Sequence, residues 1–261
     1  MRAIVLSAGQ GRRLLPLTTE LPKCLLRVRG EESGLEVQLR TLAGAGIRRA
    51  TVMTGFGADL VEHTLQQIFI PGLSVETLHN PFYSLADNLI TCWLAREAMT
   101  EDFVLLNGDT FFEPQILEAL LASPSAPLTL VINRKPEYDD DDMKVSLTET
   151  GELQAVSKTL KAENIDGESI GLMMFRGRGV DYFRDELKAA ARQPEALHAW
   201  YLSVINTMAA TLPIHTSCIG EAWWGEIDCA EDLTAVRAVL ERSPQIPTNS
   251  PSAARAARAA R

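Results

Sequence analysis

Cysteine and histidine are both scarce in this chain, which limits the metal sites open to it. Its 261 residues include four cysteines, Cys24, Cys92, Cys218 and Cys229, and no two of them form a Cys-x-x-Cys pair. A zinc site would need a tight group of ligands, and none is visible. The four histidines share no spacing, so we expect each to be structural or at the surface. We expect the cysteines to be reduced thiols, buried or half-buried, in a cytoplasmic protein.

Basic residues and long apolar runs are also lacking. The chain carries 25 Lys and Arg against 34 Asp and Glu, a net charge of -9. This balance argues against a general nucleic-acid binder, but it leaves room for a small anionic ligand held by a local group of cations. No stretch reaches 18 apolar residues, and the apolar start of the chain is too short for a signal peptide or a membrane span. We therefore expect neither nucleic acid nor a membrane as a partner.

Strand-like and helix-like segments alternate through the first half of the chain. Apolar runs that end in glycine or a polar turn predict buried strands, and apolar residues at helical spacing predict helices. The alternation indicates a parallel sheet covered by helices, and right-handed crossovers make it a doubly wound α/β fold. The predicted strands span residues 2–8, 48–56, 73–80, 102–109 and 127–134, and the predicted helices span 34–47, 58–69, 88–99 and 113–123.

The pattern changes after residue 134. We expect an added hairpin over 143–158, with its turn at Thr150-Gly151, and C-terminal helices that join the same mostly parallel sheet. Residues 1–242 are thus expected to form one domain. The Pro- and Ser-rich stretch 243–261 predicts a disordered tail, although its repeated Ala-Ala-Arg leaves open a short helix on a partner. The remaining predicted strands span 169–175 and 214–220, and the remaining helices span 179–192, 197–211 and 230–243.

A loop rich in glycine and positive charge follows the first predicted strand. We call residues 6–26, LSAGQGRRLLPLTTELPKCLL, the glycine loop. Ligands of open α/β sheets bind at the carboxyl edge of the strands, where backbone N–H groups near Gly9 and Gly11 could approach a phosphate. Arg12, Arg13 and Lys23 add charge that can bind phosphate oxygens. A plain glycine turn with solvated arginines is the alternative.

Two better-known phosphate-binding motifs are absent from the glycine loop. The Walker motif needs Gly-Lys followed by Ser or Thr, and the dinucleotide motif G-x-G-x-x-G needs a third glycine where this chain has Leu14. The proline-bearing segment that follows argues against a helix that starts directly at Gly11. We therefore expect an extended loop that drapes over a nucleotide.

Two aspartates stand after predicted strands that are far apart in the chain. Asp109 ends the run VLLNGD, and Asp228 lies between a short predicted strand and the last predicted helix. Carboxylates from two distant segments can hold one Mg2+ through oxygen ligands, with nucleotide phosphates completing the shell. The alternatives are an ordinary Asn-Gly-Asp turn for Asp109 and a helix cap for Asp228.

The glycine loop resembles the signature of the nucleotidyltransferases that join a nucleoside triphosphate to a sugar phosphate or a phospho-alcohol. That signature runs Leu-x-Ala-Gly-x-Gly-x-Arg, then Pro-x-Thr, then Pro-Lys. The family also places a Gly-Asp after a central strand and a Glu-x-Asp-x-x-x-Asp-Leu near the C-terminus, and both recur here in the same order. The matching positions of the loop are Leu6, Ala8, Gly9, Gly11, Arg13, Pro16, Thr18, Pro22 and Lys23.

The resemblance implies a Rossmann-like fold of the nucleotidyltransferase type and a role for each matching residue. Lys23, Arg13 and Asp109 would be catalytic, with Lys23 stabilising charge on the α-phosphate as it is attacked. Asp109 and Asp228 would hold Mg2+, and Glu226 would support them. The acceptor phosphate would attack directly, so no nucleophilic Ser, Cys or His is needed. The residues expected to bind the nucleotide are Leu6, Ala8, Gly9, Gly11, Arg12 and Asn88.

The middle of the chain resembles the branch of this family that comprises cytidylyltransferases acting on phosphocholine and similar phospho-alcohols. The similar segments are NPFYSLADNLITCWLARE, DDMKVSLTETGELQAVSKTL and GESIGLMMF. They imply that Lys158 meets the acceptor phosphate and that Lys144 and Glu168 line the acceptor site. One position departs, because the Asn-Asn of that branch is Asp87-Asn88 here.

An acidic run and several aromatic residues could serve a cationic acceptor group. The run YDDDD at 138–142 could place negative charge beside such a group, or it could be a solvated loop. Trp200, Tyr201, Trp223 and Trp224 could offer rings for cation–π contact, or they could belong to the core. The solvated loop and the core are the favoured alternatives, because acidic runs are usually solvated and aromatic residues at helical or strand positions are usually buried.

The favoured hypothesis is an Mg2+-dependent nucleotidyltransferase that joins CTP to a phospho-alcohol or phosphonate-like acceptor and releases pyrophosphate. One rival is a sugar-1-phosphate nucleotidyltransferase that uses UTP or another triphosphate. A second rival is a non-catalytic nucleotide sensor of the same fold, and a third is a dinucleotide-dependent oxidoreductase, which the missing third glycine disfavours. The expected partners are small-molecule substrates, and the oligomeric state is open between monomer and dimer.

Overall fold

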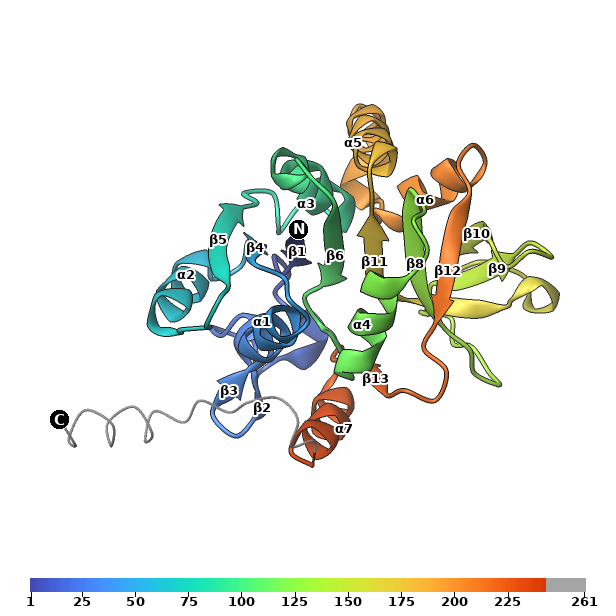
Figure 1. Cartoon of the computed structure of the whole chain (residues 1–261). Coiled ribbons are helices and arrows are strands. Elements are labelled where there is room, and N and C mark those ends of the chain that lie inside the picture. Colours follow the sequence, from blue (N-terminus) through green and yellow to red (C-terminus); the bar gives the residue numbers. More distant parts are fainter. Residues whose placement is uncertain (243–261) are drawn as a thin grey trace, which may run out of the picture.

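A nine-stranded, mostly parallel sheet forms the centre of the molecule, and helices cover both of its faces (Figure 1). The computed structural model describes residues 1–242. The predicted tail, 243–261 with its Ala-Ala-Arg repeat, lies outside the described residues. Within residues 1–242, no helix has the length and apolar character that a membrane crossing requires. The predicted doubly wound α/β architecture is confirmed.

Most predicted strands and helices lie where the sequence pattern placed them. The central sheet contains β1 (Arg2–Leu6), β4 (Arg49–Thr54), β5 (Ser74–His79), β6 (Phe103–Asn107), β8 (Leu128–Asn133), β9 (Lys144–Leu147), β10 (Leu153–Ser157), β11 (Gly167–Phe175) and β12 (Ile214–Cys218). Two small pairs stand apart, β2 (Arg27–Arg29) with β3 (Glu32–Ser33) and β7 (Thr110–Phe112) with β13 (Trp224–Glu226). The helices are α1 (Gly34–Gly44), α2 (Ala58–Gln67), α3 (Asn88–Ala95), α4 (Pro114–Ala122), α5 (Arg178–Ala190), α6 (Leu202–Ala209) and α7 (Ala230–Leu240).

The order of the strands is β10-β9-β11-β6-β1-β4-β5, and β8 and then β12 extend the sheet from β11. The four strands β6, β1, β4 and β5 are parallel to one another. Strand β11 runs antiparallel between β6 and β8, and the predicted hairpin is the antiparallel pair β9 and β10. The second half of the chain therefore extends the same sheet, as the sequence predicted.

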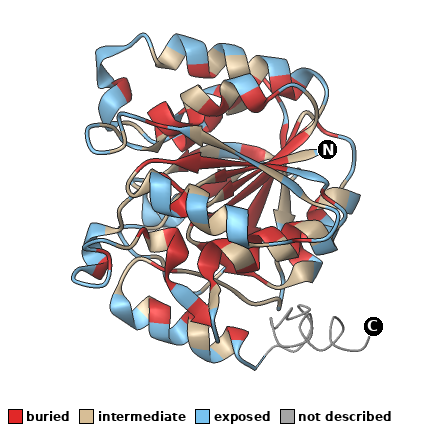
Figure 2. Ribbon diagram, turned by 90° about the vertical axis from the view of Figure 1, so that its left-hand side faces the viewer, coloured by how far each residue is buried: buried red, intermediate tan, exposed pale blue. Residues whose placement is uncertain are grey.

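Side chains of the central strands alternate between two apolar cores, one on each face of the sheet. In β1, Ala3 and Val5 pack into the core that α1 and α4 cover, while Ile4 packs into the core that α3, α5 and α6 cover. Figure 2 shows the buried sheet between these two layers of helices. Strands buried on both faces need apolar residues at every position, which explains the continuous run in β1.

Several local predictions are wrong, and α1 for example ends at Gly44 instead of 47. The helix expected over 197–211 is a 3-10 turn, Pro194–His198, followed by α6. The carbonyls of Leu197 and Ala199 accept hydrogen bonds from the N–H groups of Asp87 and Leu89, at the start of α3. These bonds hold the backbone at Ala199 in an extended conformation, which interrupts the expected helix. Helix α2 ends at Gln67 instead of 69. Cys218 is exposed, because it is the last residue of β12, which pairs with only one strand.

Candidate active site

Two predicted site segments leave the sheet side by side. Strands β1 and β6 are adjacent and parallel, and Leu6 pairs with Asn107 at their carboxyl ends. The chain crosses from β1 to β4 through α1 on one face, and it returns from β5 to β6 through α3 on the other face. The strand order therefore reverses between β1 and β6, and ligands of doubly wound sheets bind at such a point.

The glycine loop is compact, so the predicted extended conformation is wrong. Gly11 adopts a left-handed φ of 75°, and a 3-10 turn, Arg12–Leu14, follows at once. Inside the loop, the hydroxyl of Thr18 donates to the carbonyl of Gly11 at 2.8 Å. A second 3-10 turn, Lys23–Leu25, ends the loop. The reason is local, because the left-handed φ of Gly11 lets the chain change direction into the 3-10 turn that follows.

A cavity of about 190 Å³ lies between the glycine loop and the end of β6. Of the residues predicted to bind the nucleotide, Ala8 is buried beside this cavity's lining residues, and Arg12 is exposed. Sequence reasoning did not assign Ser7, Cys24, Asn107 or Gly108 to the site. The cavity is lined by Leu6, Ser7, Gly9, Gly11, Lys23, Cys24, Asn88, Asn107, Gly108 and Asp109.

Close packing at the end of β6 explains one of the missed residues. A Cβ at Gly108 would lie 2.4 Å from the hydroxyl of Ser7 and 2.6 Å from the carbonyl oxygen of Leu6, so only glycine fits there. The hydroxyl of Ser7 is buried and has no hydrogen-bond partner among the described residues. It is therefore a polar atom in the cavity wall that a bound ligand could satisfy.

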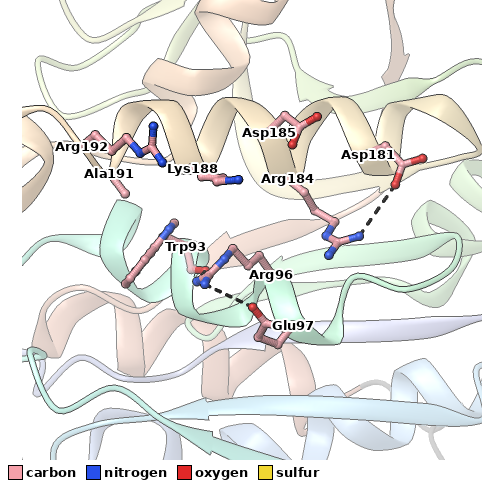
Figure 3. Close-up of a pocket in the computed structure, with 9 residues that line it drawn as sticks. All are labelled: Trp93, Arg96, Glu97, Asp181, Arg184, Asp185, Lys188, Ala191 and Arg192. Atoms are coloured by element: carbon pink, nitrogen blue, oxygen red, sulfur yellow. Dashed lines mark hydrogen bonds and ion pairs between the residues drawn. The ribbon is translucent and has the colours of Figure 1, made fainter.

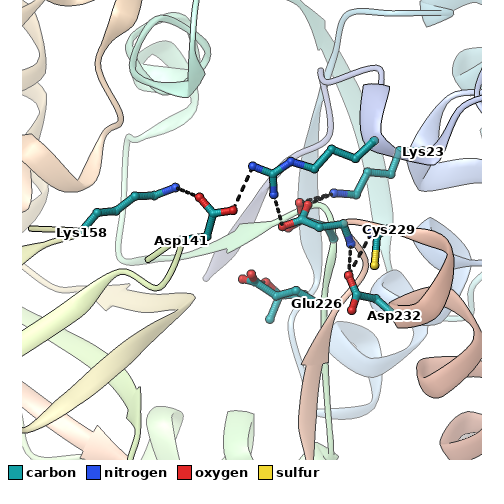
Figure 4. Close-up of polar contacts among 10 residues, drawn as sticks. Lys23, Asp141, Lys158, Glu226, Cys229 and Asp232 are labelled. Carbon is teal, nitrogen blue, oxygen red and sulfur yellow. Dashed lines mark hydrogen bonds and ion pairs between the residues drawn. The ribbon is translucent and has the colours of Figure 1, made fainter. Parts of the chain in front are cut away.

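Lys23 lies between the two predicted metal ligands. Its Nζ is 2.7 Å from Asp109 Oδ2 and 2.8 Å from Asp228 Oδ1 (Figure 4). The pairing of β7 with β13 brings the distant Asp228 here, since the N–H of Ile227 donates to the carbonyl of Asp109 at 3.1 Å. The two aspartates thus face each other across one ammonium group at the cavity.

The charges of this group explain its pKa shifts. Burial alone would lower the pKa of Lys23, but the carboxylates of Asp109 and Asp228 outweigh burial and hold that pKa above its usual range. Burial, and then the charges of the same two aspartates, raise the pKa of Glu226 to about 8. Thr110 donates a hydrogen bond to Glu226 at 3.2 Å. One ammonium therefore faces three carboxyl groups, and the surplus of oxygen ligands and negative charge suits a hard divalent cation.

The protein groups alone do not enclose such a cation. Among residues 1–242, no group of three or more His, Cys, Asp or Glu side chains is arranged to hold a metal ion. Two carboxylates leave most of a magnesium shell for water and phosphate oxygens, which is the usual arrangement at phosphoryl-transfer sites. The donor set fits a metal that arrives with, or is completed by, a phosphorylated ligand.

Asn88 lines the cavity on the α3 side, and the buried Tyr201 contacts both Asn88 and a second lining residue, Asn107. Asn88 is the first residue of α3, and its Oδ1 accepts from the N–H of Tyr201 at 3.0 Å. Tyr201 is fully buried, and its hydroxyl donates to Asn107 Oδ1 at 3.0 Å. The core alternative therefore holds for Tyr201, whereas Trp200 is exposed and Trp223 and Trp224 are partly buried.

Two of the predicted acceptor residues, Lys144 and Glu168, are buried and form hydrogen bonds and ion pairs with other parts of the protein. Lys144 Nζ donates to the carbonyls of Asp140, at 3.4 Å, and Lys158, at 3.0 Å. Glu168 accepts from Asn133 at 2.8 Å and pairs with Lys135 at 2.9 Å. Neither lines the cavity beside Lys23. Their assignment to the acceptor stays a prediction.

Lys158 lies across from the glycine loop. Its Nζ is 3.1 Å from Asp141 Oδ1 and 4.2 Å from the centre of the Trp200 ring. Asp141 also pairs with Arg13 at 3.0 Å, and Arg13 approaches Asp228 at 4.0 Å. A continuous series of charges therefore joins the predicted acceptor residue to the predicted metal ligands.

A larger cavity, of about 580 Å³, lies between α3 and α5 (Figure 3). Arg96 covers the ring of Trp93 there, and cations and acids alternate along its walls. None of the residues predicted for catalysis or binding lines it. We therefore place the candidate active site at the smaller cavity, where the strand order reverses and the charged groups converge.

Gly11 and Gly9 offer a matched test of the loop. At Gly11, alanine would have to adopt a φ of 75° and its Cβ would lie 2.9 Å from Lys23 Cδ. We expect Gly11→Ala to lower the free energy of unfolding by about 1–2 kcal/mol and to reduce turnover by displacing Lys23. At Gly9 an added Cβ meets nothing within 4 Å. Because Gly9 lines the cavity, we expect Gly9→Ala to keep the stability of the parent protein but to bind CTP more weakly. Urea unfolding measures the stability of both variants, and calorimetry measures their affinity for CTP. Equal stability and equal affinity of the two variants would contradict the assignment of this loop to the nucleotide.

Known proteins share both sequence and fold with this chain. Residues 2–137 match the family described as Nucleotidyl transferase. CMP-5'-(3-aminopropyl)phosphonate synthase of Streptomyces rubellomurinus is 36% identical over 126 residues, which are 48% of this chain and 20% of that protein. The bifunctional IPC transferase and DIPP synthase of Aquifex aeolicus is 22% identical over 248 residues, which are 92% of this chain and 52% of that protein. The chain thus spans about half, or less, of the length of these curated relatives.

A solved structure agrees with this relationship at the level of the fold. The inositol-1-phosphate CTP transferase from T. maritima superposes with a TM-score of 0.77 and 20% identity, covering 95% of this chain and 98% of that one. The family match itself covers more than half of this chain and includes the glycine loop and Asp109. The chain therefore belongs to the Nucleotidyl transferase family, as the signature in its glycine loop predicted.

Proposed function

We propose that this chain is an Mg2+-dependent cytidylyltransferase that joins CTP to a phosphorylated alcohol or a phosphonate and releases pyrophosphate. The observation that carries the proposal is the position of Lys23, within 2.8 Å of both Asp109 and Asp228 at the wall of the glycine-loop cavity. CTP is favoured because the similar proteins include a CTP transferase and a synthase of a CMP-linked phosphonate. Residues 1–242 would act as one domain.

In the proposed reaction an acceptor oxygen forms a bond to the α-phosphorus of CTP, and the bond from that phosphorus to the bridging oxygen of the β-phosphate breaks. Catalysis of this kind depends on positioning and on stabilisation of charge. The glycine loop would hold the nucleotide through Leu6, Ala8, Gly9, Gly11 and Arg12, with Asn88 on the opposite wall. Arg13 and Lys23 would offset the charge of the phosphates.

Lys23 would act as a fixed cation and not as an acid. Its pKa lies above the usual range for lysine, so it keeps its proton at neutral pH. Burial also raises the pKa of the neighbouring Cys24 thiol to about 12, so this cysteine is not a nucleophile. Bound Mg2+, held by Asp109 and Asp228, would supply further charge neutralisation at the phosphates.

The acceptor side of the site would centre on Lys158. Of the two predicted acceptor lysines, Lys144 donates hydrogen bonds to two backbone carbonyls, whereas the ammonium of Lys158 pairs with the side chain of Asp141. Lys144 would contribute by holding the backbone at Lys158 through its carbonyl, and Glu168 by holding Lys135, which in turn pairs with Asp142. A non-catalytic sensor is disfavoured, because Lys23, Asp109 and Asp228 are all present and converge.

A product screen tests the proposal. Purified protein with Mg2+ is incubated with each of the four ribonucleoside triphosphates and a panel of phospho-alcohols, phosphonates and sugar 1-phosphates. Pyrophosphate release and product mass are measured. We expect CTP and a phospho-alcohol or phosphonate to give the CMP-linked product. UTP with a sugar 1-phosphate would support the rival transferase, and nucleotide binding without any pyrophosphate release would support the sensor.

A further inference from the structure

Asp141 joins the glycine loop to the β9–β10 hairpin. Its Oδ2 lies 3.0 Å from a guanidinium nitrogen of Arg13, and its Oδ1 lies 3.1 Å from Lys158 Nζ (Figure 4). Arg13 belongs to the 3-10 turn that follows β1, whereas Lys158 follows β10. One carboxylate therefore holds two cations that come from opposite sides of the candidate site.

Both partners of Asp141 are cations expected to bind phosphate. A carboxylate with one oxygen on each cation satisfies them in the way that a phosphate group would. The hydrogen bond and charge of Lys158, and then the charge of Arg13, hold the pKa of Asp141 below its usual range. Asp141 is therefore ionised at neutral pH and competes with phosphate for the same two partners.

The contacts of Asp141 are weak enough for a ligand to break. The side chains of Asp141 and Arg13 are 64% and 62% exposed, and exposed ion pairs contribute little because water screens them. The backbone on both sides is fastened independently, since Asp142 pairs with Lys135 at 2.7 Å and the carbonyl of Asp140 accepts from Lys144. The carboxylate of Asp141 can therefore turn away without unfolding its segment.

We propose that Asp141 is a positioning residue that occupies the phosphate-binding faces of Arg13 and Lys158 until the substrates displace it. The inference rests on the proposed function in one respect, which is that Arg13 and Lys158 bind phosphate groups of the substrates. A triphosphate that binds Arg13 also repels Asp141, because the triphosphate and the carboxylate of Asp141 are both anions. Its binding thereby weakens the hold of Asp141 on Lys158 and prepares the acceptor side, and by linkage the acceptor favours the triphosphate in return.

The test uses inorganic tripolyphosphate, which carries the charge of a triphosphate without a base. Its affinity is measured by calorimetry for the full-length protein and for Asp141→Asn. Asp140→Asn is the matched control, since it removes the same charge one residue away, and the side chain of Asp140 makes no hydrogen bond or ion pair within residues 1–242. We expect Asp141→Asn to bind tripolyphosphate about threefold more tightly than Asp140→Asn. Equal affinities would overturn the proposal.

A second comparison shows whether Asp141 acts through Arg13. In an Arg13→Ala background, Asp141→Asn should give no further gain in tripolyphosphate affinity, and a gain as large as in the parent protein would overturn the role of Arg13. Once the screen identifies an acceptor, Asp141→Asn should lower the KM for that acceptor about threefold with kcat unchanged. If no acceptor is found, the proposed function fails, whereas the tripolyphosphate comparison still decides the role of Asp141.

Discussion

Asp109→Asn is expected to lower kcat by about a hundredfold to a thousandfold, a loss typical when one group that stabilises charge at a reacting centre is removed. Asparagine keeps the shape of the side chain but removes one of the two carboxylates that face Lys23. The ammonium of Lys23 then faces one aspartate instead of two, so less negative charge is left for a divalent cation and the affinity for that cation falls as well. Pyrophosphate release at saturating substrates, followed over a titration of Mg2+, measures both effects.

A surface acid provides the control for this variant. Asp59, in the first turn of α2, is exposed, and we expect Asp59→Asn to keep the activity of the parent protein. Urea unfolding should place Asp109→Asn within about 1 kcal/mol of the parent, because the aspartate is partly exposed and its replacement has the same volume. Parent-like kcat in Asp109→Asn at saturating Mg2+ would remove Asp109 from the metal site.

The sequence predicted the fold well because each layer of the sheet has a strong local signal. Strands such as β1 are buried on both faces and read as continuous apolar runs. Some helix ends also carry a signal, since α1 begins and ends at glycine and α4 begins at Pro114. The meeting of the glycine loop with Asp109 also follows from local signals, since both segments leave the carboxyl ends of neighbouring parallel strands.

The position of Asp228 could be predicted only through the resemblance. It reaches the site because three residues of β13 pair with three of β7, a contact too short to leave a pattern in the sequence. Sequence alone also could not show that Lys144 and Glu168 are buried, because their partners, the carbonyl of Lys158 and the side chain of Lys135, lie on other segments. Burial and pairing of charged residues are decided by tertiary structure.

The acidic run at 138–142 was predicted either as a solvated loop or as the partner of a cationic group, and its members differ. Asp142 is held by Lys135, while Asp141 reaches across to Arg13 and Lys158. Among the missed residues, Asn107 and Gly108 had a usable signal, because they directly precede Asp109 at the end of β6. Ser7 and Cys24 had the same kind of signal, since Ser7 lies between Leu6 and Ala8 and Cys24 directly follows Lys23.

Lys23→Met is expected to change metal affinity and turnover in opposite directions. In the described structure the ammonium occupies one oxygen of Asp109 and one of Asp228, so it competes with a cation for both. Without it, we expect Mg2+ to bind several-fold more tightly, as calorimetry would detect. We expect kcat to fall about a hundredfold while the CTP dissociation constant changes less than tenfold, because the charge of Lys23 acts mainly on the reacting phosphate.

Unfolding of the same variant separates this account from a purely structural role of the lysine. Lys23 is 13% exposed, and its loss leaves Asp109 and Glu226 without a nearby cation among the described residues and Asp228 with only Arg13, at 4.0 Å. With a chelator present, we expect Lys23→Met to melt at a lower temperature than the parent protein. When Mg2+ is added, we expect the melting temperature of Lys23→Met to rise by more than that of the parent protein. A lysine that only braced the loop would leave Mg2+ affinity unchanged, and that result would contradict the assignment of these aspartates to a metal.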